Sequence, residues 1–378
     1  MSGRWLATAA LAVVLSAGGC TRTGAIRETQ PPRRTTSTAL TSRATAPGRQ
    51  LPPAVELVAT YPIFEDVMTA GDGRYFALEG YGLHGERVRI ARVDPDGRVD
   101  RADLKDPLGG YYFAAREQSG WLYVATSVIQ RITHTPNELV RIHASSLSVV
   151  DRTTLPDGVV SMASDPHDIW VALVDGRILR IDPASLSVLA SCAVPGATPP
   201  PAGSSSFGSL ALGPGGLWAT FGSARRTMLY RLDPRSLAVL SRRTVPESVQ
   251  GILVVADSQA VWLTGTNFAR RVDAYGNLSD PLRIPELDAA AAVGHGLLVL
   301  SIPPSSTSAL EQLTLYDEQG RMLGRSNVGD AGGQLAIDGA DVWLGHGRAV
   351  AQWRLGGTRS LTGVRGGRGA LTVGTGAS

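Results

Sequence analysis

The pattern of apolar and polar residues repeats seven times between residues 55 and 365. In each repeat an apolar run, often carrying tryptophan, is followed by a second apolar run that ends in a polar turn. Two clear copies are residues 170–172 followed by 180–183, and residues 218–220 followed by 231–234. The period of roughly 40–50 residues matches a β-propeller blade, and no helical period follows residue 50. The pattern predicts an all-β fold, a seven-bladed β-propeller of four-stranded antiparallel blades.

The second strand of each repeat is the one that the sequence marks best, and five of the seven copies contain tryptophan. A tryptophan at a fixed place in a repeat predicts a wedge that packs between neighbouring blades. The alternative role, a stacking platform for a ligand, would require the ring to face the channel. The predicted second strands are residues 75–78, 121–124, 169–172, 217–219, 261–263, 298–300 and 342–344.

The third strands end in polar turns such as residues 182–185 (Asp-Pro-Ala-Ser) and 273–276 (Asp-Ala-Tyr-Gly). Aspartate first, proline second and glycine or serine last is type I turn chemistry, because the aspartate accepts backbone N–H groups and proline presets φ. These acids are therefore predicted to be structural. Residues 94–100 (Asp-Pro-Asp-Gly-Arg-Val-Asp) also suggest calcium, but they lack the ligand spacing and terminal glutamate of a calcium loop.

Two segments compete to close the predicted ring. Residues 55–60 have the pattern of an outer strand with no blade before them, so they are expected to complete the last blade. Residues 360–364 compete for the same place. The tail beyond residue 365 is either a loose end or one extra strand at residues 370–373.

The third strand and turn at residues 229–237 (Leu-Tyr-Arg-Leu-Asp-Pro-Arg-Ser-Leu) resemble the repeats of YVTN/NHL-type and quinoprotein-like β-propellers. The resemblance covers about residues 55–365. It implies the fold and says little about function, because propellers host many unrelated activities. The repeats lack the Ala-x-Asp, Thr-Gly and Trp pattern of propellers that bind a quinone, so no cofactor is predicted.

The N-terminus resembles a bacterial lipoprotein signal peptide. Arg4 precedes an apolar run at residues 5–15, and small residues then lead to Cys20. The resemblance implies cleavage before Cys20 and lipidation of its thiol, although Ala17 stands where leucine is usual; an ordinary secretory signal with an incidental cysteine is the alternative. The predicted domains are a signal peptide (1–19), the lipidated Cys20 with a disordered Pro/Ser/Thr/Arg tether (20–53), the propeller (54–365) and a tail (366–378).

Charge and cysteine content add to this picture. Seven of the 36 Lys and Arg residues and one of the 33 acids lie in residues 1–50, so the remainder has a formal charge of −3. The basic balance therefore does not predict nucleic-acid binding; it fits a solvated tether or attraction to an anionic surface. Cys192 is the other cysteine, so no disulfide within the chain is expected once Cys20 is lipidated. Cys192 is predicted to be buried and inert.

Candidate chemistry falls in loops predicted to share one face: those between second and third strands and those between blades. Arg87, Arg131, Arg225, Arg226 and Arg348 are candidates for a cationic rim that binds an anionic sugar, phosphate or carboxylate. Under an alternative interpretation, three histidines in the same loops gather around a divalent metal. They are His84, His134 and His346.

The sequence carries no Gly-x-Ser-x-Gly elbow, His-Glu-x-x-His pair, phosphate loop or Cys-x-x-Cys-His site. The preferred hypothesis is therefore a monomeric lipoprotein, anchored at the extracytoplasmic face of the cell membrane, whose propeller binds an envelope protein or glycan. The alternative is an enzyme resembling propeller lyases or lactonases, with a metal-assisted site. A third hypothesis is a structural or assembly factor without a small ligand.

Overall fold

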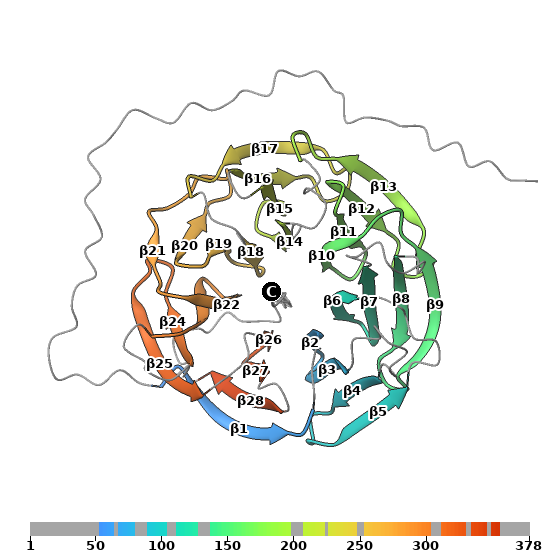
Figure 1. Cartoon of the computed structure of the whole chain (residues 1–378), viewed down its shortest axis with the longest axis vertical. Coiled ribbons are helices and arrows are strands. Elements are labelled where there is room, and N and C mark those ends of the chain that lie inside the picture. Colours follow the sequence, from blue (N-terminus) through green and yellow to red (C-terminus); the bar gives the residue numbers. More distant parts are fainter. Residues whose placement is uncertain are drawn as a thin grey trace, which may run out of the picture.

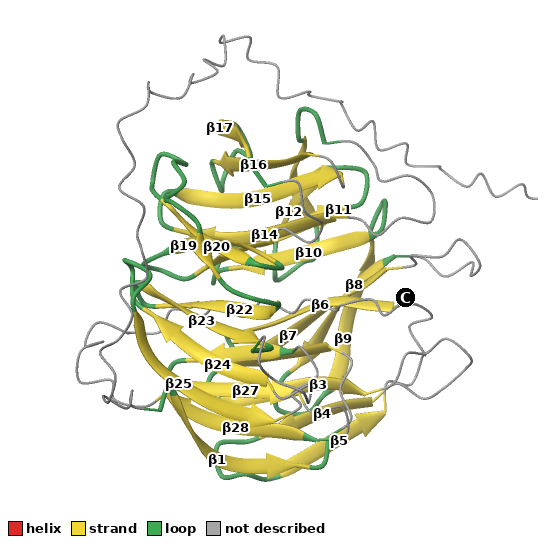
Figure 2. Cartoon of the chain, turned by 60° about the vertical axis from the view of Figure 1, so that its left-hand side comes forward, coloured by secondary structure: helices red, strands yellow, loops and turns green. Residues whose placement is uncertain are grey.

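The computed structural model describes residues 53–63, 67–79, 89–103, 111–127, 137–197, 207–223, 226–247, 253–303, 311–329, 334–345 and 349–355. In this part of the chain, 28 strands form seven four-stranded antiparallel sheets around one axis (Figure 1). Turns and loops join the strands, and the described residues contain no helix (Figure 2). The predicted all-β, seven-bladed propeller is confirmed. Within the same residues, no helix is available that is long and apolar enough to cross a membrane.

In blades 1 to 6 the four strands are consecutive in the chain and follow one another from the axis outward, each paired with the next (Figure 1). Blade 1 contains β2 (Val67–Gly71), β3 (Arg74–Glu79), β4 (Arg89–Val93) and β5 (Val99–Asp103). Blade 2 contains β6 (Tyr111–Gln118), β7 (Trp121–Ser127), β8 (Glu138–His143) and β9 (Ser148–Thr154). Blade 3 contains β10 (Val159–Ser164), β11 (Ile169–Leu173), β12 (Arg177–Ile181) and β13 (Val188–Ala193).

The other blades follow the same plan. Blade 4 contains β14 (Phe207–Gly213), β15 (Gly216–Ser223), β16 (Arg226–Leu232) and β17 (Val239–Thr244). Blade 5 contains β18 (Leu253–Ala256), β19 (Val261–Gly265), β20 (Phe268–Val272) and the short β21 (Leu282–Arg283). Blade 6 contains β22 (Leu287–Val293), β23 (Gly296–Ser301), β24 (Glu311–Tyr316) and β25 (Met322–Gly329). Blade 7 contains β26 (Leu335–Asp338), β27 (Asp341–Gly345), β28 (Val350–Leu355) and β1 (Val55–Tyr61).

The ring is closed by β1, the first strand of the chain, as the sequence predicts for residues 55–60. β1 pairs antiparallel with β28, from Val55 opposite Leu355 to Tyr61 opposite Val350. Val55 also exchanges hydrogen bonds with the hydroxyl of Ser326, on the neighbouring blade 6. The competing segment at residues 360–364, the tail, the signal peptide and the tether lie outside the described residues.

The turns between third and fourth strands fall into two classes. Blades 1, 5 and 6 place a glycine with positive φ in the turn (Gly97, Gly276 and Gly320). Blades 2, 3 and 4 instead place a leucine there, with φ of 55°, 54° and 58° at Leu147, Leu186 and Leu237. This leucine follows the serine that the sequence pattern marked, and its side chain is buried between blades. Burial of the side chain offsets the cost of a left-handed conformation in a residue that has a Cβ.

The second-strand aromatic residues form the predicted wedges. Trp170, Trp218 and Trp262 are at most 2% exposed. In blade 2 the wedge is not the tryptophan that the sequence pattern marks. Tyr123 occupies the wedge position opposite Arg141, while Trp121 pairs with His143. Trp121 lies under the Arg141 guanidinium, 4.9 Å from the ring centroid.

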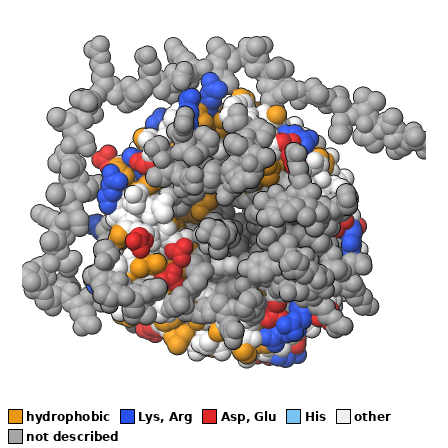
Figure 3. Space-filling model, in the orientation of Figure 1, with side chains coloured by type: hydrophobic (Ala, Val, Ile, Leu, Met, Phe, Trp, Pro, Cys, Tyr) orange, Lys and Arg blue, Asp and Glu red, His pale blue; other side chains and the backbone are white. Residues whose placement is uncertain are grey.

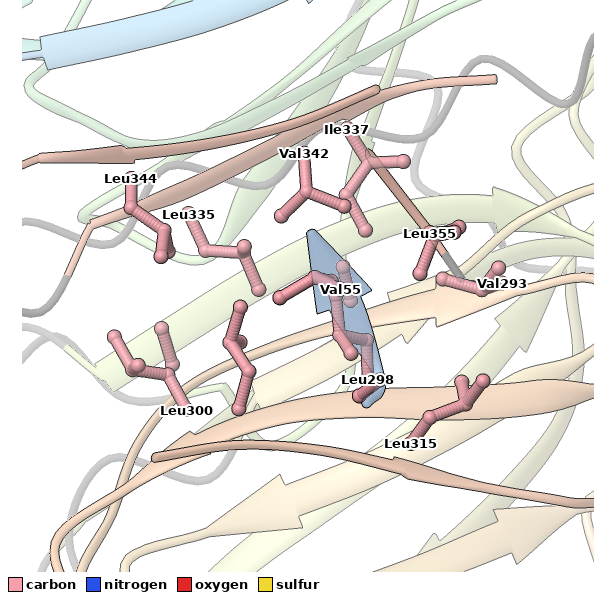
Figure 4. Packing of buried hydrophobic residues seen from close by; sticks show 14 of the residues in the cluster. Val55, Val293, Leu298, Leu300, Leu315, Leu335, Ile337, Val342, Leu344 and Leu355 are labelled. Carbon is pink, nitrogen blue, oxygen red and sulfur yellow. The ribbon is translucent and has the colours of Figure 1, made fainter. Parts of the chain in front are cut away.

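The buried apolar residues gather at the seams between blades, so each blade is covered by its neighbours. The seam between blades 6 and 7 holds the cluster shown in Figure 4, in which Val55 of β1 lies among leucines of both blades. The seam between blades 7 and 1 is aromatic: Tyr75 stacks on Trp343 with ring centroids 4.8 Å apart. Cys192 is 2% exposed within the cluster between blades 3 and 4, which confirms its predicted burial.

Candidate functional site

Most of the residues selected from the sequence lie outside the described part of the chain. These are Cys20, His84, His134, His346, Arg87, Arg131, Arg225 and Arg348. The structure places Arg226 alone of that set, as the exposed first residue of β16. Its Nη2 donates to Thr244 Oγ1 at 3.1 Å, on the outer strand of the same blade. The predicted cationic rim and the predicted histidine site therefore remain predictions.

The opposite face of the propeller is described in more detail. It is formed by the turns between first and second strands and between third and fourth strands, and all of these turns up to blade 6 lie in described segments. We call it the turn face. On the face seen in Figure 3, described basic and acidic side chains are spread around the ring rather than gathered into one patch of a single sign.

An arginine at one register position ties each of the first five blades to the next. It lies on the third strand, opposite the wedge residue, and its guanidinium reaches the third-to-fourth-strand turn of the following blade. Arg92 donates to the carbonyls of Ala144 and Ser145, and Arg141 donates to those of Pro183 and Ala184. Arg180 donates to the carbonyl of Arg235, and Arg231 donates to that of Ala274. Arg271 instead pairs with the Glu318 carboxylate at 3.2 Å. We call these residues the seam arginines. Blade 6 has Leu315 at this position and blade 7 has Gln352.

The wedge residues reinforce two of these seams. Tyr123 Oη donates to the carbonyl of Pro183 at 3.1 Å, and Trp170 Nε1 donates to that of Pro234 at 2.8 Å. Each acceptor is the second residue of the neighbouring blade's turn. At these two seams both the arginine and the aromatic residue thus hold the same turn.

The seam between blades 4 and 5 departs from this plan. Trp218 Nε1 donates within its own blade, to the carbonyl of Pro214 at 3.0 Å, rather than to the next turn. The turn of blade 5 belongs to the glycine-containing class. Beside it lies a cavity of about 480 Å³. It is lined by Pro214, Gln259, Ala260, Val261, Arg271, Val272, Asp273, Ala274, Asn277, Leu278 and Ser279.

The groove has an apolar base and polar walls whose groups are held by internal hydrogen bonds. Asp273 Oδ1 accepts the backbone N–H groups of Tyr275 and Asn277 at 2.8 Å each, and its Oδ2 accepts Asn277 Nδ2 at 2.7 Å. Burial would raise the pKa of Asp273, but these hydrogen bonds outweigh it and lower the pKa. Asp273 is therefore an ionised turn-forming residue and a poor general acid.

Tyr275 projects from this turn beside the groove. It is 78% exposed, the most exposed large apolar side chain in the described residues. Its own backbone N–H is fixed by Asp273, and Gly276 N–H donates to the Asp273 carbonyl at 2.9 Å. A rigid turn that presents an exposed aromatic ring beside an apolar groove has the composition of a protein-binding surface.

No metal centre is found among the residues that the structure describes, where no three His, Cys, Asp or Glu side chains are gathered as potential ligands. The aspartates of residues 94–100 are engaged elsewhere. Arg92 Nη2 and Arg98 Nη2 both contact Asp94 and Asp100, at 2.5–3.2 Å. These acids are ion-paired turn residues, in agreement with their predicted structural role.

The groove and the seam arginines were not found from the sequence. A signal was present, because the Arg-Leu-Asp or Arg-Ile-Asp motif recurs on the third strand. Four of the five arginines, however, bind backbone carbonyls of the next blade, which carry no residue-type signature. Tyr275 was also visible as an aromatic residue at a turn position that usually holds a small or charged residue.

Comparison with known proteins supports the fold and no family. No protein-family profile matches the sequence, and no curated protein matches it. Among solved structures, BBS1N in complex with ARL6DN, soaked with lead, is similar with a TM-score of 0.57 at 15% identity, covering 82% of this chain and 100% of that chain. BamB from Moraxella catarrhalis has a TM-score of 0.48 at 11% identity, covering 79% of this chain and 99% of that chain. The seven four-stranded blades define the class of protein as a seven-bladed β-propeller, and the similarity to BBS1N agrees with this fold.

Proposed function

We propose that this chain is a lipid-anchored, extracytoplasmic binding module whose propeller holds a protein partner on its turn face. The observation that carries the proposal is the groove between blades 4 and 5, with Tyr275 exposed beside it. The tryptophan wedges are buried between blades, whereas the ring of Tyr275 is exposed on the turn that lines the groove.

Binding at this groove has favourable energetics. Aromatic anchors carry much of the affinity of protein interfaces, especially next to a pocket that excludes water. Because the turn of Tyr275 is already fixed by hydrogen bonds of 2.8–3.0 Å, little further backbone order has to be imposed on binding. The fold itself is compatible with this use, since BBS1N, a structure with the same fold, is described in complex with another protein.

The anchor is the second part of the proposal. It is supported by the basic start, the apolar run and the small residues before Cys20. The basic segment that follows would hold the propeller near an anionic surface. A protein is favoured over a glycan as partner because the groove base is aliphatic. A second, anionic ligand on the other face is proposed to bind the predicted cationic rim, which consists of Arg87, Arg131, Arg225, Arg226 and Arg348.

Site-specific photocrosslinking tests the binding site. A photoreactive phenylalanine analogue at position 275 of the full chain, in its native envelope, is expected to give one dominant crosslinked protein. The same analogue at the exposed Leu189 on β13 is the matched control and should not capture it. The captured protein, once purified, must bind the wild-type chain and lose affinity for Tyr275→Ala. Equal capture from both positions, or binding that ignores Tyr275→Ala, would overturn the proposal.

Cys20→Ala tests the anchor separately. The variant is expected to leave the membrane fraction and to lose the mass of the acyl chains, while its propeller keeps the same melting temperature. An unlipidated Cys20 in the wild-type protein would remove the anchor from the proposal without affecting the groove.

A further inference from the structure

We infer that the outer wall of blades 3 and 4 lies against the anionic headgroups of the membrane that holds the lipid anchor. The inference rests on the proposed anchor and adds the orientation of the propeller on the membrane. Its basis is a surface on β13, β16 and β17 that combines exposed aliphatic side chains with exposed arginines (Figure 1). We call it the outer patch, and it consists of Val188, Leu189, Arg226, Leu240 and Arg242.

Blade 4 is the one blade with a positive formal charge among the described residues. Its described strands and turns contain five arginines and one acid, whereas those of the neighbouring blade 3 contain two arginines and four acids. Three of the five arginines are placed elsewhere. Arg231 and Arg243 donate to blade 5, and Arg235 lies in the turn between the third and fourth strands. Arg226 and Arg242 remain on the outer wall.

These two guanidinium groups lie on the same side of blade 4. Arg242 is opposite Tyr230 in the register, and Arg226 binds Thr244, two residues further along the same strand. Burial raises the pKa of Tyr230, and the nearby charges of Arg242 and Arg226 oppose that rise. Both arginines are exposed, and neither forms an ion pair with a described residue. Two neighbouring cations without a carboxylate partner favour an anion beside them.

The apolar part of the outer patch is poorly suited to a protein strand. β13 is the one outer strand that carries no charged residue among the described strands. Val188, Leu189 and Leu240 are 48–49% exposed. Leu189 and Leu240 are the extra residues of β-bulges at matching places in blades 3 and 4. A bulge protects the strand edge against pairing with another strand, but it leaves the side chain free to enter a lipid headgroup layer.

This combination favours a bilayer over a soluble anion. Arginine forks match phosphate oxygens, and an anionic leaflet attracts basic residues near its surface. The exposed aliphatic side chains gain from insertion between lipids, which a free phosphate or a soluble glycan does not offer. With this wall on the bilayer, the turn face stands beside the membrane, and the groove between blades 4 and 5 remains open to a partner.

Quenching by membrane lipids tests the inference on the full lipidated chain, reconstituted in vesicles. A fluorescent amino acid is placed at position 240 or, as the matched control, at position 58 of β1, on the opposite side of the ring (Figure 1). Val58 is also the extra residue of an outer-strand bulge and is 47% exposed. Brominated lipids are expected to quench position 240 more strongly in vesicles of phosphatidylglycerol and phosphatidylcholine. The difference should disappear in phosphatidylcholine alone and at high salt.

Single arginine variants sharpen this test. Arg226→Gln and Arg242→Gln are each expected to lower the ratio of membrane-bound to free walls about fivefold, as read from the quenched and unquenched fluorescence lifetimes. Arg325→Gln is the matched control, because Arg325 is an exposed arginine on the outer strand of blade 6. It should leave the ratio unchanged, and so should Tyr275→Ala in the groove.

The outcomes separate this inference from the function it rests on. Equal quenching at positions 240 and 58, or an equal difference with and without phosphatidylglycerol, would overturn the inference and leave the anchor intact. Release by inorganic phosphate, but not by chloride of equal ionic strength, would identify a soluble anion as the ligand and also overturn it. An unlipidated Cys20 would remove the anchor alone, because coupling its thiol to a maleimide lipid then allows the same quenching measurement.

Discussion

The seams between blades use two different solutions to the same packing problem. From blade 1 to blade 6 an arginine crosses each seam and binds the next turn, whereas at the seam of blades 6 and 7 the equivalent residue is Leu315, inside the apolar cluster of Figure 4. A buried arginine gains little net free energy, because its desolvation offsets its hydrogen bonds. The arginine instead fixes the position of the neighbouring turn, to which its guanidinium is bound. At the apolar seam no such turn is present, because the outer strand of blade 7 is β1, the first strand of the chain.

The seams also differ in the number of donors that hold each turn. At seams 2–3 and 3–4 an arginine and an aromatic donor hold the same turn. At seams 1–2 and 4–5 the arginine alone does so, because Phe76 has no donor and Trp218 donates within its own blade. At seam 5–6 Trp262 Nε1 has no acceptor among the described residues.

The largest expected effect is at the apolar seam. Leu300→Ala removes a fully buried side chain from the cluster of blades 6 and 7 and should lower the free energy of unfolding by about 3 kcal/mol. Urea unfolding followed by tryptophan fluorescence measures the change. Leu323→Ala, at a 41% exposed position of the same blade, is the control and should change it by less than about 0.5 kcal/mol. Similar losses in both variants would show that this cluster does not carry the seam.

A seam arginine should give a smaller loss. Arg92→Met leaves the carbonyls of Ala144 and Ser145 without their donor, so the free energy of unfolding should fall by about 2 kcal/mol. Arg98→Met is the matched control, because the 63% exposed Arg98 contacts the same two acids at the surface. It should lower the free energy of unfolding much less than Arg92→Met does, because an exposed ion pair is screened by solvent. An Arg98 effect as large as that of Arg92 would assign the stability to the surface ion pairs instead of the seam.

The left-handed leucines allow a finer test of the turns that the seam arginines hold. Leu186→Ala and Leu186→Gly both remove packing between blades, but glycine also relieves the positive φ. Leu186→Gly is therefore expected to be more stable than Leu186→Ala by about 0.5–1 kcal/mol, although it has the smaller side chain. The reverse order in thermal unfolding would mean that the backbone strain is negligible. A helix or ordinary strand position would give that reverse order.

The smallest expected effect is a loss of folding stability at acidic pH that arises from the aspartates of the turns. The pKa of Asp233 is lowered by hydrogen bonds from Ser236, first from its backbone and then from its hydroxyl. Its contribution to stability is therefore present above the ordinary value of 3.8 and is lost as the pH falls below it. Asp233→Asn should flatten this acid limb of the stability profile, measured by urea unfolding between about pH 5 and pH 2.5. If Asp233→Asn loses stability at low pH to the same extent as the wild-type protein, groups other than Asp233 are responsible for the loss.

The sequence was sufficient for the fold because the information for a propeller is local. The repeat period, the wedge aromatic residues and the Asp-initiated turns are each visible within one blade, and residues 55–60 stood out as a strand without a blade. The groove could not be derived in this way. It depends on where Trp218 donates its N–H, and on the turn of blade 5 packing against Gly215, with Ala274 within 3.3–3.7 Å of a Cβ placed there. Those contacts join different blades and leave no periodic signal.

The closing strand also sets an order of events in the biogenesis of the protein. Tyr61 and Gln352, which are joined by a hydrogen bond across β1 and β28, are 291 positions apart. Residues 55–61 are made early but have no partner until the last blade emerges, and bringing such distant segments together carries a large loop-closure entropy. During synthesis the first strand therefore has no β-sheet partner until the last blade is made, and closure of the ring is a late step.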